Sequence, residues 1–223
     1  MLSIAIDGPV GAGKSTVADE VARRLDILHL DTGAMYRAVG LAALDAGLDI
    51  QDEPAVVALC ERGGAHVDVR YENGAQVTLL NGEDVSSRIR TQEVGGAASA
   101  VSRYAEVRHM LVRRQRELAA AQPMLLDGRD IGTVVLPNAA LKVYLTASPE
   151  ARARRRLNQL LEKGEQADFA DVLAEVNARD FQDMNRAVDP LRRAEDAVVV
   201  DSSNLSFEET VQAILNLAEA AHA

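Results

Sequence analysis

The stretch that decides the fold of this chain is Ile4-Ala5-Ile6-Asp7-Gly8-Pro9-Val10-Gly11-Ala12-Gly13-Lys14-Ser15-Thr16. Residues 8–15 fit the pattern Gly-x-x-x-x-Gly-Lys-[Ser/Thr], which is typical of loops that bind the phosphates of a nucleoside triphosphate. Glycines let backbone N–H groups approach phosphate oxygens closely and allow the positive φ angles of a concave loop. The Lys14 ammonium can reach the β- and γ-phosphates, and the Ser15 hydroxyl can ligate Mg²⁺. The residues expected to bind the triphosphate are Gly8, Pro9, Val10, Gly11, Ala12, Gly13, Lys14, Ser15 and Thr16.

The residues on either side of this loop predict the secondary structure that it needs. An apolar, β-branched run ends at Ile6, as expected of a buried parallel strand. Beyond the loop, Val17, Val21 and Leu25 recur at helical spacing, which predicts a helix. A helix at this place points its free N–H groups and the positive end of its dipole at the phosphates. A glycine-rich turn that matches by chance is the alternative, but it would need neither the strand nor the helix.

Size and composition limit the class of protein. With 223 residues, 48% of them hydrophobic and 26% charged, the chain can form one well-buried globular domain. No apolar run approaches the roughly 18 residues of a membrane span, and the N-terminus lacks the features of a signal peptide. The net charge of −10 disfavours nonspecific binding to nucleic acids. The one cysteine, Cys60, has no disulfide partner, so we expect a cytoplasmic protein. From the lack of an apolar span and from the net charge, we expect that it binds neither membranes nor nucleic acids.

Strands and helices are predicted to alternate along most of the chain. The predicted strands lie at about 1–6, 27–31, 124–127, 141–146 and 197–201. This order predicts an α/β fold with a five-stranded parallel sheet and helices on both of its faces. Residues 65–90 differ, because alternating stretches flank two Asn-Gly turns, which predicts a small antiparallel β insert. A helical excursion is expected between the fourth and fifth strands.

Polar clusters follow two of the strands, at the edge where an open parallel sheet binds its ligands. Asp31-Thr32 with Arg37 follows one strand, and Asp127 with Arg129-Asp130 follows another. We expect both clusters to meet the phosphate loop. Two structural alternatives stay open, in which Asp31 is an ordinary helix cap and Arg129-Asp130 is a surface pair.

The helical excursion carries a further group of charged residues. Its first helix holds arginines at 152, 154, 155 and 156. Consecutive helical residues point in different directions, so at most one or two of these can face a ligand, and a solvated helix face is the alternative. Arg179, Asp183 and Arg186 share one face of the second helix, as part of a binding site or as a row of surface ion pairs.

These motifs resemble those of the bacterial cytidylate kinase family. The resemblance covers nearly the whole chain and is carried by residues 7–15, 30–37, 90–94, 113–116, 127–133 and 179–186. It implies a P-loop kinase fold with a β insert and a helical lid. It also implies transfer of the γ-phosphoryl group of ATP to CMP or dCMP, with Mg²⁺, in pyrimidine nucleotide metabolism.

The resemblance further implies a domain plan and an assembly. The chain, 1–223, would be a single P-loop kinase domain and a monomer whose partners are these small nucleotides. The parts of this domain would be a core of about 1–34, 91–147 and 194–223, a monophosphate-binding region of about 35–90 with its β insert at about 65–90, and a lid of about 148–193.

The resemblance also assigns roles to single residues. The residues implied in catalysis are Lys14, Arg129 and the lid arginine Arg155, with Ser15 as the metal ligand. The residues implied at the acceptor phosphate are Arg37 and Arg129, and those at the sugar are Arg179 and Asp183. The residues implied at the cytosine ring are Thr32, Ser99, Arg108, Asp130 and Arg186.

Two rival functions remain open. Another small kinase, acting on AMP, UMP or shikimate, would share the phosphate loop, and a panel of acceptors would separate it. A GTP-dependent switch is a rival from a different class and would turn over GTP slowly without any acceptor. Such switches usually carry an Asn-Lys-x-Asp guanine motif, which this chain lacks.

Overall fold

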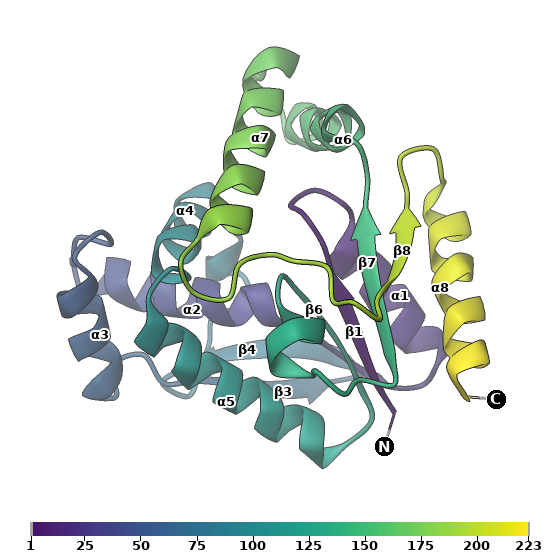
Figure 1. The fold of residues 1–223 in the computed structure, drawn as a ribbon. Helices are drawn as coiled ribbons and strands as arrows, with labels where there is room; N and C mark the ends of the chain where they lie inside the picture. The colour runs from purple at the N-terminus through teal and green to yellow at the C-terminus, as the bar shows by residue number, and fades with distance from the viewer. Residues whose placement is uncertain (1, 223) are drawn as a thin grey trace. The chain divides into compact units, whose positions relative to one another are not determined.

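The computed structural model describes residues 2–222, which form two compact units (Figure 1). The first unit comprises residues 28–123. The second is built from both ends of the chain, residues 2–27 and those from Met124 onward. Among the described residues, no helix combines the length and the apolar character that crossing a membrane requires.

Parallel strands form the centre of the second unit. β1 (Ser3–Asp7) lies between β6 (Met124–Gly128) and β7 (Leu141–Thr146), and β7 pairs with β8 (Val198–Asp201). With β2 (Leu28–Asp31), the sheet has the order β2-β6-β1-β7-β8. The predicted five-stranded parallel sheet is confirmed, and β1 has the central position, between two strands from far along the chain.

Two helices share an apolar core with this sheet. α1 (Lys14–Arg24) and α8 (Phe207–His222) lie side by side in Figure 1. α1 begins at Lys14, so the phosphate loop leads directly into its first turn. A capping box opens α8, because Ser206 Oγ accepts from the Glu209 N–H and the Glu209 carboxylate accepts from the Ser206 N–H. The core residues of this cluster include Ile4, Ile6, Val17, Val21, Leu125, Val143, Leu145, Val211 and Ile214.

The predicted helical excursion lies between β7 and β8. It consists of α6 (Pro149–Glu162) and α7 (Phe169–Asn185), which pack on each other (Figure 1). Their shared core is small and apolar, with Ala153 and Leu160 of α6 against Val172 and Val176 of α7. Ser148 caps α6 by accepting from the Ala151 N–H, as the Ser-Pro-Glu sequence predicts.

The first unit combines helices with the predicted β insert. Its helices are α2 (Thr32–Asp45), α3 (Glu53–Glu61), α4 (Gln92–Val101) and α5 (Ala105–Ala121), with a 3₁₀ turn at Arg88–Arg90. The insert is a three-stranded antiparallel sheet of β3 (Val67–Glu72), β4 (Ala75–Leu80) and β5 (Glu83–Asp84), in that order. Asn73-Gly74 and Asn81-Gly82 make its turns with positive φ angles, as type I′ geometry requires.

Candidate active site

The phosphate loop follows β1 and has a geometry that requires glycine. Gly8 has a φ of +154°, and a Cβ at this position would lie 2.0 Å from the carbonyl oxygen of Leu145 in β7. Gly13 is left-handed, with a φ of +86°, and is the N-cap of α1. The loop therefore packs closely against the sheet at Gly8 and leads at Gly13 into the N-terminus of a helix. The free N–H groups of that N-terminus suit a bound polyphosphate.

Lys14 lies inside this loop. Its Nζ donates a 2.8 Å hydrogen bond to the carbonyl oxygen of Pro9, and the residue is 6% exposed. Burial, together with the charge of Arg129, lowers the pKa of Lys14 to about 7, although the charge of Asp127 acts in the opposite direction. A buried ammonium with an incomplete set of partners gains from a nearby anion, because the anion stabilises its charged form.

Ser15 and Asp127 form a pair of oxygen groups beside Lys14. The Ser15 hydroxyl donates a 2.9 Å hydrogen bond to Oδ2 of Asp127. Asp127 lies near the C-terminal end of β6 and is 3% exposed. Mg²⁺ prefers such hard oxygen groups and usually completes its shell with water and substrate phosphates. Within residues 2–222, no group of three or more His, Cys, Asp or Glu side chains is arranged to hold a metal ion. The two oxygen groups of Ser15 and Asp127 fit an ion that takes its other ligands from water and phosphate. The sequence motif indicates a metal role for Ser15 but not for Asp127.

Asp7 at the end of β1 holds the backbone that follows Asp130. Its carboxylate accepts 2.7 Å hydrogen bonds from the N–H groups of Ile131 and of Gly132, at the start of a π-helical turn over Ile131–Val135. Burial raises the pKa of Asp7 to about 6, although these two hydrogen bonds favour its charged form. Asp7 thereby fixes the backbone directly after two predicted site residues, Arg129 and Asp130.

Arg129 and Asp130 are joined to the C-terminal end of α7. The Arg129 Nε donates to Asp183 Oδ2 at 2.7 Å, and Arg186 Nη2 lies 3.5 Å from Asp130 Oδ1. Arg186 is itself held by the carbonyl oxygen of Asp189, which accepts from its Nε at 2.8 Å. The structure thus brings four predicted site residues together in the second unit, and the alternative of a surface row does not describe them.

Charge pairing in this cluster outweighs desolvation. Burial favours the neutral form of Asp183, but the charge and hydrogen bond of Arg129, with the charges of Arg186 and Arg179, together lower the pKa of Asp183. Burial likewise disfavours the charged form of Arg129, yet Asp183 raises the pKa of Arg129 above its usual value. Arg179 is half-buried on the same helix, one turn before Asp183.

The arginines of α6 have different partners. Arg155 donates from its guanidinium to the carbonyl and hydroxyl oxygens of Ser202, just after β8. Arg154 stacks over the ring of Phe169, 5.2 Å from the ring centroid. Arg152 is 3% exposed and contacts Val10 of the phosphate loop and Asp180 of α7. The sequence alone did not indicate that Arg152 contacts the phosphate loop, because neighbouring arginines in one helix cannot be told apart until their partners are known.

The first unit holds the remaining predicted site residues. Arg108 of α5 is fully buried, lies 5.6 Å from the ring centroid of Tyr36, and donates to the Ser102 carbonyl oxygen at 3.1 Å. Thr32 is buried at the start of α2, and Arg37 one turn later is half-buried. Within residues 2–222, the Arg37 guanidinium makes no hydrogen bond or ion pair.

The local contacts of the other residues in this unit are simpler. Ser99 of α4 is half-buried, and its carbonyl oxygen accepts from the Ser102 hydroxyl. Asp31 caps α2 by accepting from the Ala34 N–H at 3.1 Å, so the helix-cap interpretation of Asp31 is correct. Sequence reasoning missed Tyr36, whose ring faces a buried cation.

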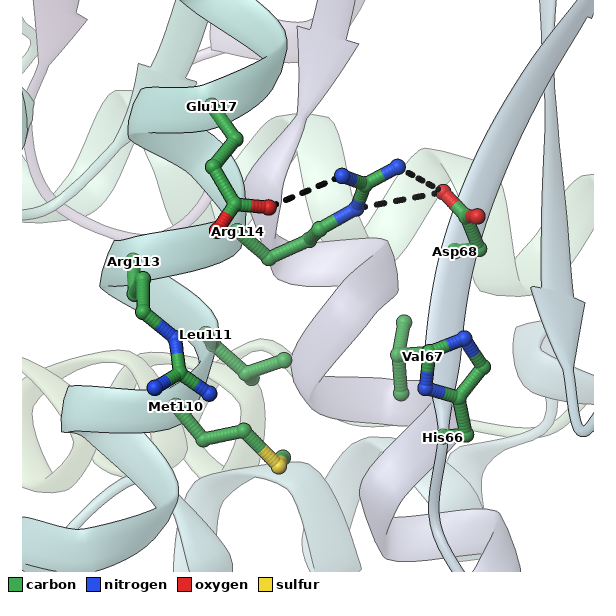
Figure 2. Close-up of a pocket in the computed structure, with 8 residues that line it drawn as sticks. All are labelled: His66, Val67, Asp68, Met110, Leu111, Arg113, Arg114 and Glu117. Atoms are coloured by element: carbon green, nitrogen blue, oxygen red, sulfur yellow. Dashed lines mark hydrogen bonds and ion pairs between the residues drawn. The ribbon is translucent and has the colours of Figure 1, made fainter. Parts of the chain in front are cut away.

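A pocket of about 280 Å³ lies in the first unit, next to β3 and α5 (Figure 2). Its most strongly held cation, Arg114, is paired with Asp68 at 2.7 Å and with Glu117 at 2.9 Å, so its charge is already neutralised. No residue predicted for the nucleotide site lines this pocket. The residues around it are His66, Val67, Asp68, Met110, Leu111, Arg113, Arg114 and Glu117.

Known proteins of one family are similar to this protein over nearly its whole length. Residues 4–220 match the family model described as "Cytidylate kinase". A "Cytidylate kinase" of Desulforamulus reducens is 49% identical over 97% of this chain and 96% of its own length. Another of Caldicellulosiruptor saccharolyticus is 46% identical over 97% of this chain and 95% of its own length. A crystal structure of an uncharacterized protein from Eubacterium ventriosum is similar in fold, with a TM-score of 0.54 and 9% identity over 99% of each chain.

Proposed function

The chain belongs to the cytidylate kinase family, and from this premise we infer that it transfers the γ-phosphoryl group of ATP to CMP or dCMP. It is accordingly a transferase and an ATP-dependent kinase. The observation that carries this conclusion is the family match over residues 4–220, which includes the phosphate loop. The roles of individual residues are proposals supported by the contacts described above.

The phosphate loop is proposed to hold ATP. Backbone N–H groups of residues 8–16 bind its phosphates, and Lys14 places its charge on the β- and γ-phosphates. Ser15 and Asp127 are the residues that would hold Mg²⁺, which neutralises phosphate charge when bound. The hydrogen bond between these two side chains supports this assignment.

The acceptor phosphate is proposed to bind Arg37 and Arg129. In the reaction, an oxygen of the acceptor phosphate forms a bond to the γ-phosphorus while the bond to the β,γ-bridging oxygen breaks and ADP leaves. Two arginines offset the repulsion between the acceptor dianion and ATP, and they align the attacking oxygen. A phosphate nucleophile needs no general base, so positioning and charge stabilisation carry the chemistry.

The nucleoside of the acceptor is proposed to bind through polar and basic side chains. Arg179 and Asp183 bind the sugar, and Asp130 reads the amino group of cytosine. The pairing of Asp130 with Arg186 and of Asp183 with Arg129 supports a preformed arrangement. The other residues proposed at the base are Thr32, Ser99, Arg108 and Arg186.

Residues 148–193 are proposed to be a lid that excludes water from the reaction, with Arg155 as its catalytic arginine. The exclusion of water matters because water would otherwise accept the phosphoryl group. Arg155 donates to the Ser202 carbonyl oxygen, and as a catalytic arginine it would exchange this partner for a phosphate when the lid closes. We further propose a cytoplasmic monomer.

A panel of acceptors tests the function. The purified protein is assayed with ATP and Mg²⁺ against CMP, dCMP, UMP, AMP and shikimate, with ADP release as the readout. We expect the highest kcat/KM for CMP or dCMP. A higher kcat/KM for another acceptor, or GTP turnover that no acceptor accelerates, would overturn the proposal.

A further inference from the structure

We propose that Arg152 is a positioning residue that joins the phosphate loop to α7 and thereby couples binding of the phosphoryl donor to binding of the acceptor nucleotide. The inference rests on the proposed function, since it needs two nucleotide sites. It concerns a residue that faces neither nucleotide in the assignments above and acts through the loop.

The contacts of Arg152 span three segments of the second unit. Its Nε donates to the carbonyl oxygen of Ala147 at 2.9 Å, just before α6. Its Nη1 donates to the carbonyl oxygen of Val10 at 2.9 Å, in the phosphate loop. Its guanidinium also pairs with both carboxylate oxygens of Asp180 in α7, at 3.0 and 2.5 Å. One rigid, planar group therefore fixes the relative positions of the loop, α6 and α7.

The contact with Val10 sets the direction of a backbone N–H in the loop. The peptide between Val10 and Gly11 is trans, so its C=O and the Gly11 N–H point in opposite directions. A carbonyl oxygen held by Arg152 outside the loop therefore turns the Gly11 N–H away from Arg152. Gly11 has a φ of +75°, and a Cβ there would lie 3.3 Å from the Arg152 Cβ. This close approach leaves the loop little room to shift relative to α6.

The contact with Asp180 leads to the proposed acceptor residues. Asp180 lies directly after Arg179 and one turn before Asp183, which holds Arg129. The side chains of Arg152 and Asp180 are 3% and 13% exposed, so separating them would leave an unpaired buried charge. A shift of α7 on acceptor binding would therefore move Asp180, Arg152 and the Val10 carbonyl together. An acceptor that favours one position of α7 would favour one state of the donor loop.

The simplest alternative is that this ion pair only holds α6 against α7. Such a role would affect stability and would leave the mutual influence of the two nucleotides unchanged. Coupling between two ligands is a ratio of affinities and is the same whichever ligand binds first. It is therefore a readout that a merely structural pair would not change.

Calorimetry with a non-hydrolysable ATP analogue and Mg²⁺ measures this coupling. The Kd of the analogue is determined with and without a saturating acceptor monophosphate, for the parent and for Asp180→Asn and Arg152→Lys. We expect acceptor to tighten analogue binding roughly 5-fold or more in the parent and less than about 2-fold in both variants. Asp171→Asn changes an exposed carboxylate on the first turn of the same helix and is expected to keep the parent ratio.

The acceptor in this test is whichever monophosphate turns over fastest in the panel, so a wrong acceptor overturns the proposed function alone. Circular dichroism and urea unfolding verify that each variant is folded. If Asp180→Asn does not fold, Asp180→Glu retains the charge but changes the reach, and a reduced ratio is again expected. A parent ratio near one, or an unchanged ratio in folded variants, would overturn the inference.

Discussion

The Nε of Arg129 donates a 2.7 Å hydrogen bond to Oδ2 of Asp183, which joins the residue after β6 to α7. The two side chains are 22% and 11% exposed, so a buried partner within the protein itself orients the arginine. An arginine that is held by one carboxylate can keep a second group of its fork for a phosphate. This arrangement lowers the cost of aligning the acceptor, because fewer side-chain rotamers are lost on binding.

Asp183→Asn is expected to lower stability in a pH-dependent way. Since Arg129 lowers the folded-state pKa of Asp183, its contribution is present above the unfolded pKa and is lost as pH falls through the folded value. Replacing the carboxylate should cost about 1–3 kcal/mol at pH 7, and the cost should be smaller near pH 3. Urea unfolding of parent and variant at both pH values checks this. A difference of equal size at both would show that the charge of Asp183 does not stabilise the fold.

Asp7→Asn is expected to show the opposite pH trend. Because burial raises the folded-state pKa of Asp7 to about 6, the folded state binds the proton more tightly than the unfolded state does. The parent should therefore lose stability relative to the variant as pH rises from about 4 to about 6, by up to roughly 3 kcal/mol. The amide of the variant also loses one backbone hydrogen bond at every pH, which lowers its stability by a constant amount. The prediction is therefore tested on how the stability difference between parent and variant changes with pH. Parallel curves of unfolding free energy against pH would contradict the raised pKa.

Lys14→Met is expected to abolish most activity without unfolding the protein. The ammonium is proposed to stabilise charge that develops in the transition state, so kcat should fall roughly 10³-fold or more. Met fills a similar volume, and removing a desolvated charge should leave stability at pH 7 equal or higher. Steady-state kinetics and urea unfolding test the two expectations separately. A folded variant whose kcat stays within about 10-fold of the parent would exclude the catalytic role.

Elements with strong local signals could be predicted closely from the sequence. The sequence predicts a helix over 105–121 and a strand over 141–146, and α5 (Ala105–Ala121) and β7 (Leu141–Thr146) agree with both at each end. These boundaries follow from periodicity, from Pro123 after the helix and from a continuous apolar run. The β insert was predictable for a similar reason, since its turns carry Asn-Gly pairs that few other conformations favour.

Contacts between distant segments were not predictable from patterns. Ser15 and Asp127 are 112 residues apart, and Arg152 and Val10 are 142 residues apart, so no spacing rule relates them. The π-helical turn after Asp130 was missed because its shape depends on the carboxylate of Asp7, which lies 124 residues before Ile131 in the sequence. Sequence patterns indicated which residues carry chemistry, whereas the structure shows which partner holds each of them.

Base choice is expected to depend on Asp130, which is 6% exposed and lies 3.5 Å from Arg186. Cytosine presents an amino donor where uracil presents a carbonyl acceptor, and a carboxylate can only accept. UMP would therefore set its carbonyl oxygen against the carboxylate and lose this hydrogen bond, which costs on the order of 1–3 kcal/mol and predicts a preference for CMP of roughly 10- to 150-fold in kcat/KM.

Asp130→Asn should narrow this preference, because an amide can also donate to the uracil carbonyl. The measurement is kcat/KM for CMP and UMP on the parent, on Asp130→Asn and on Asp171→Asn, which changes an exposed carboxylate of α7 and should keep the parent ratio. We expect the CMP:UMP ratio of Asp130→Asn to fall about 10-fold, with most of the change in CMP use. If kcat/KM fell equally for both acceptors and the ratio stayed the same, Asp130 would not read the base. Its part would then be to hold Arg186, since loss of that ion pair would disturb both acceptors alike.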